Sequence, residues 1–410
     1  MGGKASIYMV LGFSLIFLVA SINYGRLTGS AVDNNVDYYK NTVAHNIAVS
    51  GANMAANQIF IDKDWNAGYT NLPFSGGYIN VTVEDIGGNK KKITSTGEFQ
   101  GVPKKVAIIL QPSGYSKYAY YTNIFPGNKY LVTGDTITGP FHTQGKLNAQ
   151  GSPVFQGKAS AKNGIKLMGN ATPKFYGGFE SGVDVPLNWS TSDTKAAAQA
   201  GGFVFNAGGA GKVDVRLTFN GNATVTYSRR FDAGSWAPDT TVALSAFAPN
   251  GIIYVEKGNL YLKGVVSGKY TVIADQSSGM GTGNVYIEDD IRYKSNPLTN
   301  PASTDMLGII SSNNVLISDN LANRFNVNID ASIFAYKGGL GIDNTTMPYS
   351  GTLKVFGGVI EYQGQTTGVY SGSTITNGYR ERIVFDERLM LNSPPYFPAT
   401  DKYEVVSWLE

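Results

Sequence analysis

The most pronounced hydrophobic pattern lies near the N-terminus. From Ala5 to Ile22 there are eighteen residues without a charge, with Lys4 before them and Arg26 after them. As a helix this run spans ~27 Å, close to the ~30 Å hydrocarbon core of a bilayer. Three interpretations compete: a cleaved secretory signal, for which residues 19–21 form a weak cleavage site, a plain membrane anchor, and a helix used for assembly.

The pattern that follows predicts that the helix continues. No proline occurs between Val32 and Phe60, and apolar residues there recur mostly at three- and four-residue steps. That spacing is typical of one stripe of an amphipathic helix. Gly25 and Gly29 are candidates for a flexible joint between the two halves, because glycine costs ~1 kcal/mol in a helix interior. We therefore expect one long helix over residues 1–60.

A small sheet is predicted next. Residues 78–84 alternate apolar and polar side chains, as a strand with one buried face does. Residues 92–99 and 105–110 provide two more strands, with a glycine-rich turn before the first of them. We expect these three strands to form an antiparallel meander over residues 61–113, with one face packed on the helix.

Beyond Gly114 the pattern predicts β structure to the end of the chain. Short apolar alternations recur, often roughly 8–12 residues apart, as in a sandwich, a barrel or a right-handed β-helix. Very short strands, neutral turns and the lack of a strict repeat favour the β-helix, or β-solenoid, over residues 114–410. The protein is thus predicted to be mainly β, with three domains.

The region 184–249 departs from this pattern and is expected to be an insertion. It contains a Gly/Ala-rich stretch over residues 196–212. Asn220-Gly221 is a strong two-residue turn. It predicts a hairpin in which residues 214–219 pair with residues 223–230.

Composition excludes several classes of function. Thirty-three basic and thirty acidic residues give a net charge of +3, which argues against a nucleic-acid partner. No cysteine is present, which excludes disulfides, thiol nucleophiles and cysteine metal sites. The two histidines, His45 and His142, are far apart in sequence, which argues against a histidine metal site and a serine–histidine triad. We expect no cofactor, no metal and no catalytic residue.

One acidic cluster is the best candidate for chemistry. Glu288, Asp289 and Asp290 follow one another and are succeeded by Arg292. Strand alternation places Glu288 and Asp290 on one face, where a carboxylate pair binds calcium or activates water. The competing interpretation, which we favour, is a solvated turn after a strand over residues 285–287.

The N-terminus resembles that of type IV pilins and pseudopilins. A very short leader, Met-Gly-Gly-Lys, is followed at once by the apolar run. The resemblance implies that a prepilin peptidase cuts after a glycine, with Gly3 or Gly2 at the matching position. The family usually carries a glutamate five residues into the mature chain, whereas no acidic residue precedes Asp33 here. Certain minor pilins of the pilus-assembly type share that departure.

The resemblance extends further along the chain. The meander is similar to that of pilus-assembly minor pilins, and residues 139–164 and 375–410 are similar to stretches of β-helical, pilin-like bacterial surface proteins. This implies a structural subunit of an extracellular type IV pilus-like filament on the cell surface. Its partners would be copies of itself and a pilus-type assembly machinery, and it would lie in the inner membrane before assembly.

The expected assembly contacts are the apolar positions of the helix. They are Ile7, Leu11, Leu15, Leu18, Ile22, Val36, Val43 and Ile47. Two alternatives stay open. One is a membrane-anchored, secreted β-helix enzyme that acts on polysaccharide, and the other is a minor adhesin at the tip of a filament.

Overall fold

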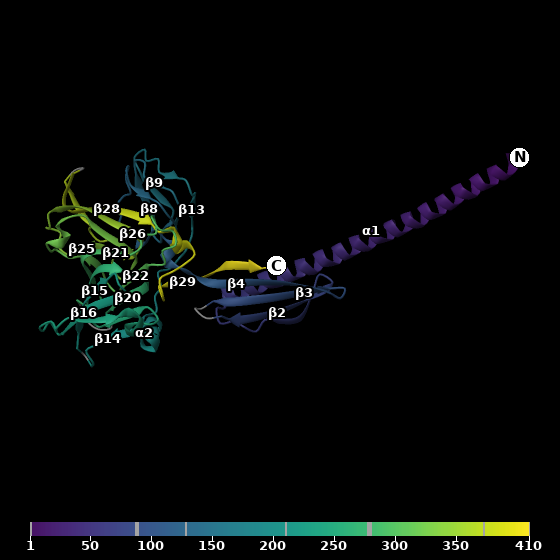
Figure 1. Ribbon diagram of the computed structural model, residues 1–410. Helices are drawn as coiled ribbons and strands as arrows, with labels where there is room; N and C mark the ends of the chain where they lie inside the picture. Colours follow the sequence, from purple (N-terminus) through teal and green to yellow (C-terminus); the bar gives the residue numbers. More distant parts are fainter. Residues whose placement is uncertain are drawn as a thin grey trace. The chain divides into compact units, whose positions relative to one another are not determined.

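The computed structural model describes residues 2–86, 90–127, 129–209, 211–276, 281–371 and 374–409. Most elements are strands, and one long helix opens the chain (Figure 1). The chain divides into two compact units, Met1–Pro112 with Lys402–Glu410, and Ser113–Asp401. The sequence had placed the helix and the meander in separate domains and the C-terminal segment in the third. Helix, meander and C-terminal segment instead share the first unit.

Helix α1 (Gly2–Ile61) is continuous over 60 residues, a length of about 90 Å. Gly25 and Gly29 lie within it without a break, so the expected joint is not seen. Within the first unit, Figure 1 shows the N-terminal part of α1 running far past the end of the sheet. Only the C-terminal part of the helix is therefore available for packing on that sheet.

The sheet of the first unit confirms the predicted antiparallel meander. Its strand order is β1-β2-β3-β4-β29. The sequence predicted the three middle strands and missed the two outer ones. The bounds are β1 (Tyr69–Phe74), β2 (Gly77–Asp85), β3 (Lys91–Phe99), β4 (Val102–Gly114) and β29 (Ala399–Leu409).

Small residues allow α1 to lie very close to this sheet. The buried helix positions recur every three or four residues, and they include Ala44, Ala48 and Ala52. Below them, Gly97 of β3 has no room for a side chain, because an added Cβ would lie 2.3 Å from the Ala44 carbonyl oxygen and 2.4 Å from the Ala48 nitrogen. Gly51 of α1 makes a similar close approach to β3, with an added Cβ 2.5 Å from Ser95 Oγ.

The second unit contains many short strands. Its first part holds η1 (Tyr115–Lys117), β5 (Tyr120–Ile124), β6 (Thr136–Ile137), β7 (Phe141–Thr143), β8 (Leu147–Gln150), β9 (Val154–Phe155), β10 (Ala159–Ala161), β11 (Ile165–Met168), β12 (Lys174–Phe175) and β13 (Phe179–Ser181). Its middle part holds α2 (Thr191–Gly201), β14 (Phe203–Phe205), β15 (Val213–Asn220), β16 (Thr224–Phe231), β17 (Thr240–Ala243), α3 (Leu244–Phe247), β18 (Ile252–Glu256), β19 (Leu260–Val266), β20 (Lys269–Asp275) and β21 (Val285–Tyr293). Its last part holds β22 (Met306–Ser311), β23 (Val315–Ile317), η2 (Ala322–Arg324), β24 (Val327–Ala335), β25 (Leu340–Ile342), β26 (Tyr349–Gln363), β27 (Gly368–Ser371), β28 (Thr374–Phe385) and η3 (Glu387–Met390).

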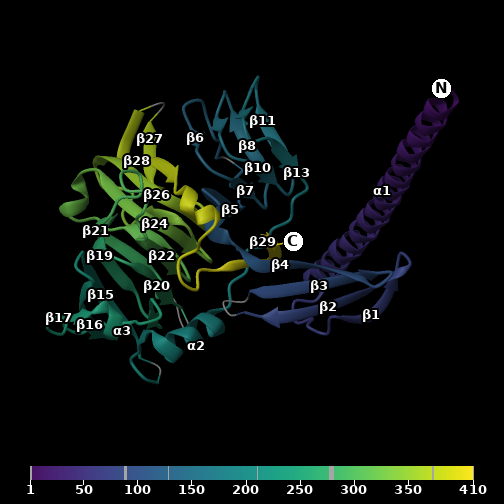
Figure 2. The ribbon, with the colours of Figure 1, turned by 45° about the vertical axis from the view of Figure 1, so that its right-hand side comes forward.

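Two parallel ladders run through the unit, and after their first steps, β14 to β18 and β15 to β19, they join strands that are next but one in sequence. One ladder runs through β14, β18, β20, β22, β24 and β26, and Figure 2 shows its later members side by side. A second ladder runs through β15, β19, β21, β23 and β25. The unit is therefore mainly β with extensive parallel pairing, and a regular right-handed β-helix stays a prediction.

The first ladder continues into the early part of the unit. Strand β26 also pairs in parallel with β5, with Ile360 opposite Tyr121, and β7, β10 and β13 follow. The first strand of the unit is thus placed beside one of its last. Sequence patterns do not reveal such a pairing, because both partners read only as short apolar strands.

The segment 184–249 is part of the unit's strand network. The predicted hairpin is confirmed, since β15 and β16 pair antiparallel with Leu217 opposite Tyr227. The expected two-residue turn at Asn220-Gly221 is wrong, because Phe219 pairs with Val225 and the connection is therefore longer. Strand β14 belongs to the first parallel ladder and β15 to the second. The segment is therefore not the separate insertion that was expected. The Gly/Ala-rich stretch is partly helical, because α2 covers its alanines and Ser190 caps the helix by accepting a hydrogen bond from the Asp193 nitrogen at 3.3 Å.

A row of asparagine side chains, called the asparagine ladder below, forms hydrogen bonds along one edge of the sheet that contains β15, β19, β21, β23 and β25. Asn284 Oδ1 accepts a hydrogen bond from the Asn314 nitrogen at 3.2 Å, and Asn314 Oδ1 accepts one from the Gly339 nitrogen at 3.1 Å. Asn259 Oδ1 accepts from the Asn284 nitrogen at 3.0 Å, and the Asp214 carboxylate accepts from the Asn259 nitrogen at 3.1 Å. Each side-chain oxygen therefore accepts a hydrogen bond from the backbone N–H of the next residue in the row, which removes the cost of leaving a buried N–H unpaired.

Candidate assembly surface

The N-terminal part of α1 is an apolar cylinder with no cover from its own chain. The described side chains of residues 3–39 are all exposed. They include large apolar groups, with Leu15 at 63% and Phe17 at 70% exposure. Residues 5–22 are apolar on all sides of the helix, and a helix of this kind is normally found in a membrane or inside a larger assembly.

Six of the eight predicted assembly residues lie on this cylinder. Their side chains are 44–63% exposed, with Val36 the lowest and Leu15 the highest. The six are Ile7, Leu11, Leu15, Leu18, Ile22 and Val36. Their role in assembly stays a prediction, for which the structure leaves their side chains accessible.

The other two predicted residues belong to the chain's own core. Ile47 is buried, and Val43 is half-buried against the same cluster. Both lie where α1 packs on the meander, so the surface that is left for a partner ends near Lys40. Sequence periodicity did not distinguish the two halves, because both carry apolar residues at helical spacing.

The length and composition of α1 suffice for a membrane span. The described helix from Ser6 to Ile61 contains an eighteen-residue window with a mean hydropathy of 1.9, none of it buried. Gly3, the predicted cleavage position, and Lys4 lie in the first turn of the helix and are exposed. Cleavage after Gly3 stays a prediction.

The acidic cluster does not form the pair that strand alternation suggested. Residues 288–290 lie within β21, where the register against β19 shifts, so three residues stand opposite Lys263 alone. Such a bulge interrupts the two-residue alternation. The cluster is therefore neither a regular carboxylate pair nor a simple turn after the strand.

The three carboxylates of the cluster turn to different partners. Glu288 faces Arg216 at 3.7 Å and Lys263 at 3.8 Å. Asp290 accepts hydrogen bonds from Arg292 Nε at 2.9 Å and from the Asn328 nitrogen at 2.7 Å. Asp289 accepts one from the nitrogen of its neighbour Asp290 at 2.7 Å. Across the described ranges no three His, Asp or Glu side chains converge as metal ligands.

A buried carboxylate that the sequence did not single out lies between β26 and β5. Glu361 is 2% exposed and accepts hydrogen bonds from the Tyr120 hydroxyl at 2.5 Å and the Leu340 nitrogen at 3.1 Å. Burial raises the pKa of Glu361 to about 7, and the nearby Glu381 carboxylate adds to the rise, whereas the bonds from Tyr120 and Leu340 and the charge of Lys129 oppose it. No motif surrounds Glu361 in the sequence, because its partners come from distant strands.

His142 forms a buried pair with a serine. Its Nδ1 lies 2.8 Å from Ser160 Oγ, and the two residues stand opposite each other on β7 and β10. The ring also packs beside Tyr118 and Tyr121, with centroids 5.9 and 5.3 Å away. Both side chains of the pair are buried.

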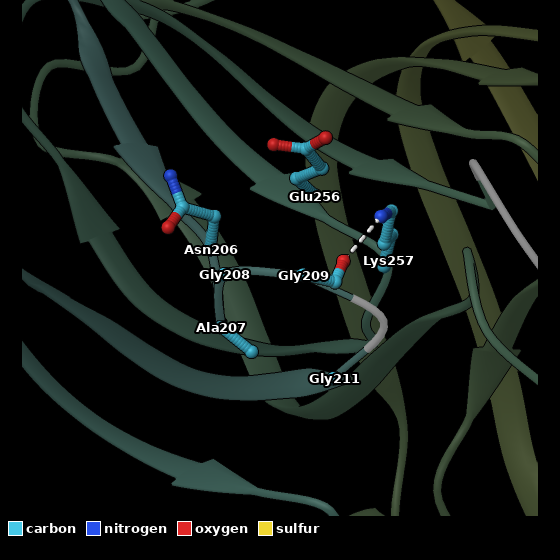
Figure 3. A pocket seen from close by; sticks show the side chains of 7 residues that line it. All are labelled: Asn206, Ala207, Gly208, Gly209, Gly211, Glu256 and Lys257. Carbon is cyan, nitrogen blue, oxygen red and sulfur yellow. Dashed lines mark hydrogen bonds between the residues drawn. The ribbon is translucent and has the colours of Figure 1, made fainter.

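A shallow pocket lies beside the glycine-rich stretch between β14 and β15. Figure 3 shows its lining side chains, among them Asn206, Glu256 and Lys257. Lys257 Nζ donates a hydrogen bond to the Gly209 carbonyl at 2.7 Å, and Glu256 accepts one from Lys195 Nζ at 2.7 Å. Both side chains thus already have partners within the chain.

Comparison with known proteins gives a distant likeness among solved structures. No protein-family model and no curated protein matches the chain. Among solved structures, the competence-associated pilin ComZ from Thermus thermophilus is similar over 84% of this chain and 86% of that chain. The sequence identity is 12% and the TM-score is 0.35.

Proposed function

We propose that the protein is a structural subunit of an extracellular type IV pilus-like filament and polymerises through α1. The observation that carries this proposal is the exposed stretch of residues 3–39, apolar on all sides over residues 5–22, on a helix of 60 residues. A plain membrane anchor needs only ~20 residues. Here the helix continues without interruption into the packed first unit, which would hold it rigidly enough to dock copies side by side.

Burial of apolar surface supplies the driving force in this proposal. Each fully buried leucine or isoleucine contributes ~1.5–3 kcal/mol relative to exposure in water. Before assembly the cylinder lies in the inner membrane, with Lys4 and Arg26 at the two ends of its uncharged run. After extraction it packs against the same surface of other copies, so the apolar side chains never face water.

The second unit would form a rigid outer body. We propose that its parallel ladders are the coils of an irregular right-handed β-helix. The pairing of strands that are next but one in sequence and the asparagine ladder support this proposal. Charged residues make up only 15% of the chain, which suits close lateral packing of subunits better than capture of a charged polymer.

No catalysis is part of this proposal. The polysaccharide-cleaving alternative needs a carboxylate pair held for acid–base work, and the best sequence candidate, residues 288–290, has its charges turned to separate partners. The full chain in detergent should leave a panel of acidic and neutral polysaccharides intact, with and without calcium. Cleavage that is lost in an Asp290→Asn variant would contradict the proposal.

Electron microscopy of sheared surface material tests the assembly directly. We expect filaments whose dominant protein, identified by mass spectrometry, is this chain. A chain that is found only as a minor component at filament ends would favour the tip adhesin. A chain that is found only in the membrane fraction would contradict the proposal.

A further inference from the structure

The early strands of the second unit form small parallel sheets that end in β11 and β12. Strand β11 pairs with β8, and β12 pairs with β9, which in turn pairs with β6. In the part of the chain that the structure describes, β11 and β12 are the outermost strands on one side of these two sheets, and Figure 2 shows β11 at the margin of this group. We call the uncovered side of β11 and β12 the open end.

Apolar side chains at the open end lack the cover that their register partners have. Leu167 stands opposite Ala149, which is fully buried, yet Leu167 is 50% exposed. Phe175 stands opposite the fully buried Phe155 and is only half-buried, with one ring face stacked on Phe155 at a centroid distance of 4.8 Å. Both residues therefore occupy positions that another layer of side chains covers one strand earlier in each sheet.

The backbone at the open end is also directed outward. The Leu147 nitrogen of β8 donates to the Gly164 carbonyl at 2.9 Å, one residue before its register partner Ile165. In a parallel pair, the bonds of such a residue go to the two neighbours of its register partner. Ile165 and Leu167 therefore direct their own N–H and C=O groups away from β8, to the open side. An edge of this kind is a template for a further strand.

The open end is positively charged. Lys166 and Lys174 are exposed there, and among the described residues no ion pair engages either of them. Between residues 139 and 185 the chain has five lysines and two acidic residues. The two acidic residues, Glu180 and Asp184, are already paired with other lysines at 2.5 and 2.9 Å. The positive charge of the open end is thus left for a neighbouring molecule.

We propose that the open end binds an extended strand of another protein in which apolar and acidic side chains alternate. Its backbone would pair with Ile165 and Leu167 along the edge of β11, the mode by which an exposed sheet edge takes up a peptide. Its apolar side chains would cover Leu167 and Phe175, and its carboxylates would lie beside Lys166 and Lys174. Main-chain bonds and apolar burial supply affinity, whereas the lysines select the sign of the partner's charge.

The open end of a second copy is a poorer occupant. Edge to edge, two copies would bring Lys166 and Lys174 close to the same lysines of the other copy, and lysines on an edge strand oppose the pairing of like edges. The proposed partner is therefore a different protein. This inference goes beyond the proposed function and does not depend on α1, so its failure would leave assembly through the helix untouched.

Fluorescence anisotropy with a designed peptide tests the proposal. The probe is a short fluorescent peptide in which valine and glutamate alternate, added to the full chain in a neutral detergent. A peptide with lysine in place of glutamate is the control for uptake by the detergent micelle. We expect the glutamate peptide to bind at least tenfold more tightly at low salt. No binding of the glutamate peptide, or equal binding of both peptides, would overturn the proposal.

A proline at the edge locates the binding. Leu167→Pro removes a backbone N–H that points to the open side and that β8 does not use, and proline is tolerated in edge strands at such positions. It should weaken binding of the glutamate peptide at least tenfold. The bound peptide should also slow hydrogen exchange at Ile165 and Leu167 in the unmodified chain. Unchanged binding by Leu167→Pro would overturn the assignment of the peptide to this edge.

Charge reversal supplies an independent readout that leaves the edge intact. Lys166→Glu with Lys174→Glu should reverse the preference, so that the lysine peptide binds more tightly. Lys104→Glu with Lys105→Glu is the matched control, because it makes the same change at two exposed lysines of the first unit. Equal effects of the two double variants would overturn the proposal. Self-association of the unmodified chain that Leu167→Pro abolishes would assign the open end to a second copy and would overturn the acidic partner.

Discussion

Glu361 is a single residue that makes the stability of the second unit depend on pH. Its carboxylate is enclosed between β26 and β5 and is held by Tyr120 and the Leu340 nitrogen. Burial raises its pKa from 4.5 to about 7. The folded state therefore holds this proton over a pH range in which the unfolded chain has already released it.

The sign of the pH effect follows from that difference. The stabilisation is fully present below pH 4.5 and is lost as the pH rises toward about 7. The loss amounts to about 3 kcal/mol, at 1.36 kcal/mol for each pKa unit. Glu361→Gln puts a neutral group of nearly the same shape in this place, whose oxygen can accept from the Leu340 nitrogen and whose NH2 can donate to the Tyr120 oxygen. It should therefore remove most of this pH dependence and stabilise the unit at pH 8.

Chemical unfolding at pH 5 and at pH 8, followed by a signal of the second unit, checks this prediction. Glu387→Gln is the control, because it changes an exposed glutamate of the same unit. Equal effects of Glu361→Gln at the two pH values would contradict the assignment of the pH dependence to this carboxylate.

The burial of Glu361 and its contact with Tyr120 could not be predicted from the sequence. Glu361 and Tyr120 are 241 positions apart, and their contact exists only because β5 pairs with β26. The uncovered apolar residues of α1 were predictable, because their environment depends on a local run. The sequence did not reveal where along α1 the meander begins to cover the helix, since the exposed Val36 and the buried Ile47 follow the same periodicity.

Among the elements, α1 packs very closely on β3. Gly97→Ala places a methyl group 2.3 Å from the Ala44 carbonyl oxygen, so the helix must move away from the sheet. We expect a loss of about 1–3 kcal/mol in the stability of this unit, the usual cost of overpacking. Thermal unfolding of the full chain in detergent measures it.

Gly12→Ala is the matched control for that experiment. Gly12 lies in α1, where an added Cβ meets nothing within 4 Å. It should leave the stability of the first unit unchanged or raise it slightly, because alanine favours helix by ~1 kcal/mol over glycine. A Gly97→Ala variant as stable as Gly12→Ala would show that α1 and β3 are not in such close contact.

Removing one side chain of the asparagine ladder should lower the stability of the second unit. Asn284→Ala removes the acceptor of the Asn314 nitrogen, which lies in a partly buried environment. The expected loss is about 1–3 kcal/mol, the cost of leaving a buried donor unsatisfied. Asn163→Ala, which removes an exposed bond to the Gln144 carbonyl, should cost less because water replaces it. Urea unfolding measures the loss of stability in the two variants. Equal losses would contradict a structural role for the asparagine ladder.

Elements with a local signature were predicted best. The middle strands of the meander alternate clearly, and the two strands of the hairpin were predicted, although Phe219 pairs with Val225 and the turn is longer than Asn220-Gly221. Strand β29 was missed as a partner of β4 because an edge pairing between distant segments leaves no local pattern. Helix α2 was taken for a turn region because its alanines lie in a Gly/Ala-rich stretch.

For the molecule as a whole, assembly through α1 requires that the mature chain keep its apolar helix. The first residue of surface-exposed protein should therefore lie within the first few positions, near Gly3 or Lys4. N-terminal sequencing of sheared material determines it. A start near Asn23 would mean ordinary signal cleavage, and the surface assigned to assembly would be absent from the secreted protein.

The most direct test of assembly through α1 is filament formation by one charged variant. Leu15→Asp places a carboxylate in the middle of the apolar cylinder, where close packing would bury it without a partner. Leu321→Asp makes the same exchange at an 86% exposed position of the second unit. Electron microscopy of sheared material should show no filaments from Leu15→Asp and normal filaments from Leu321→Asp. Normal filaments from Leu15→Asp would contradict polymerisation through this helix.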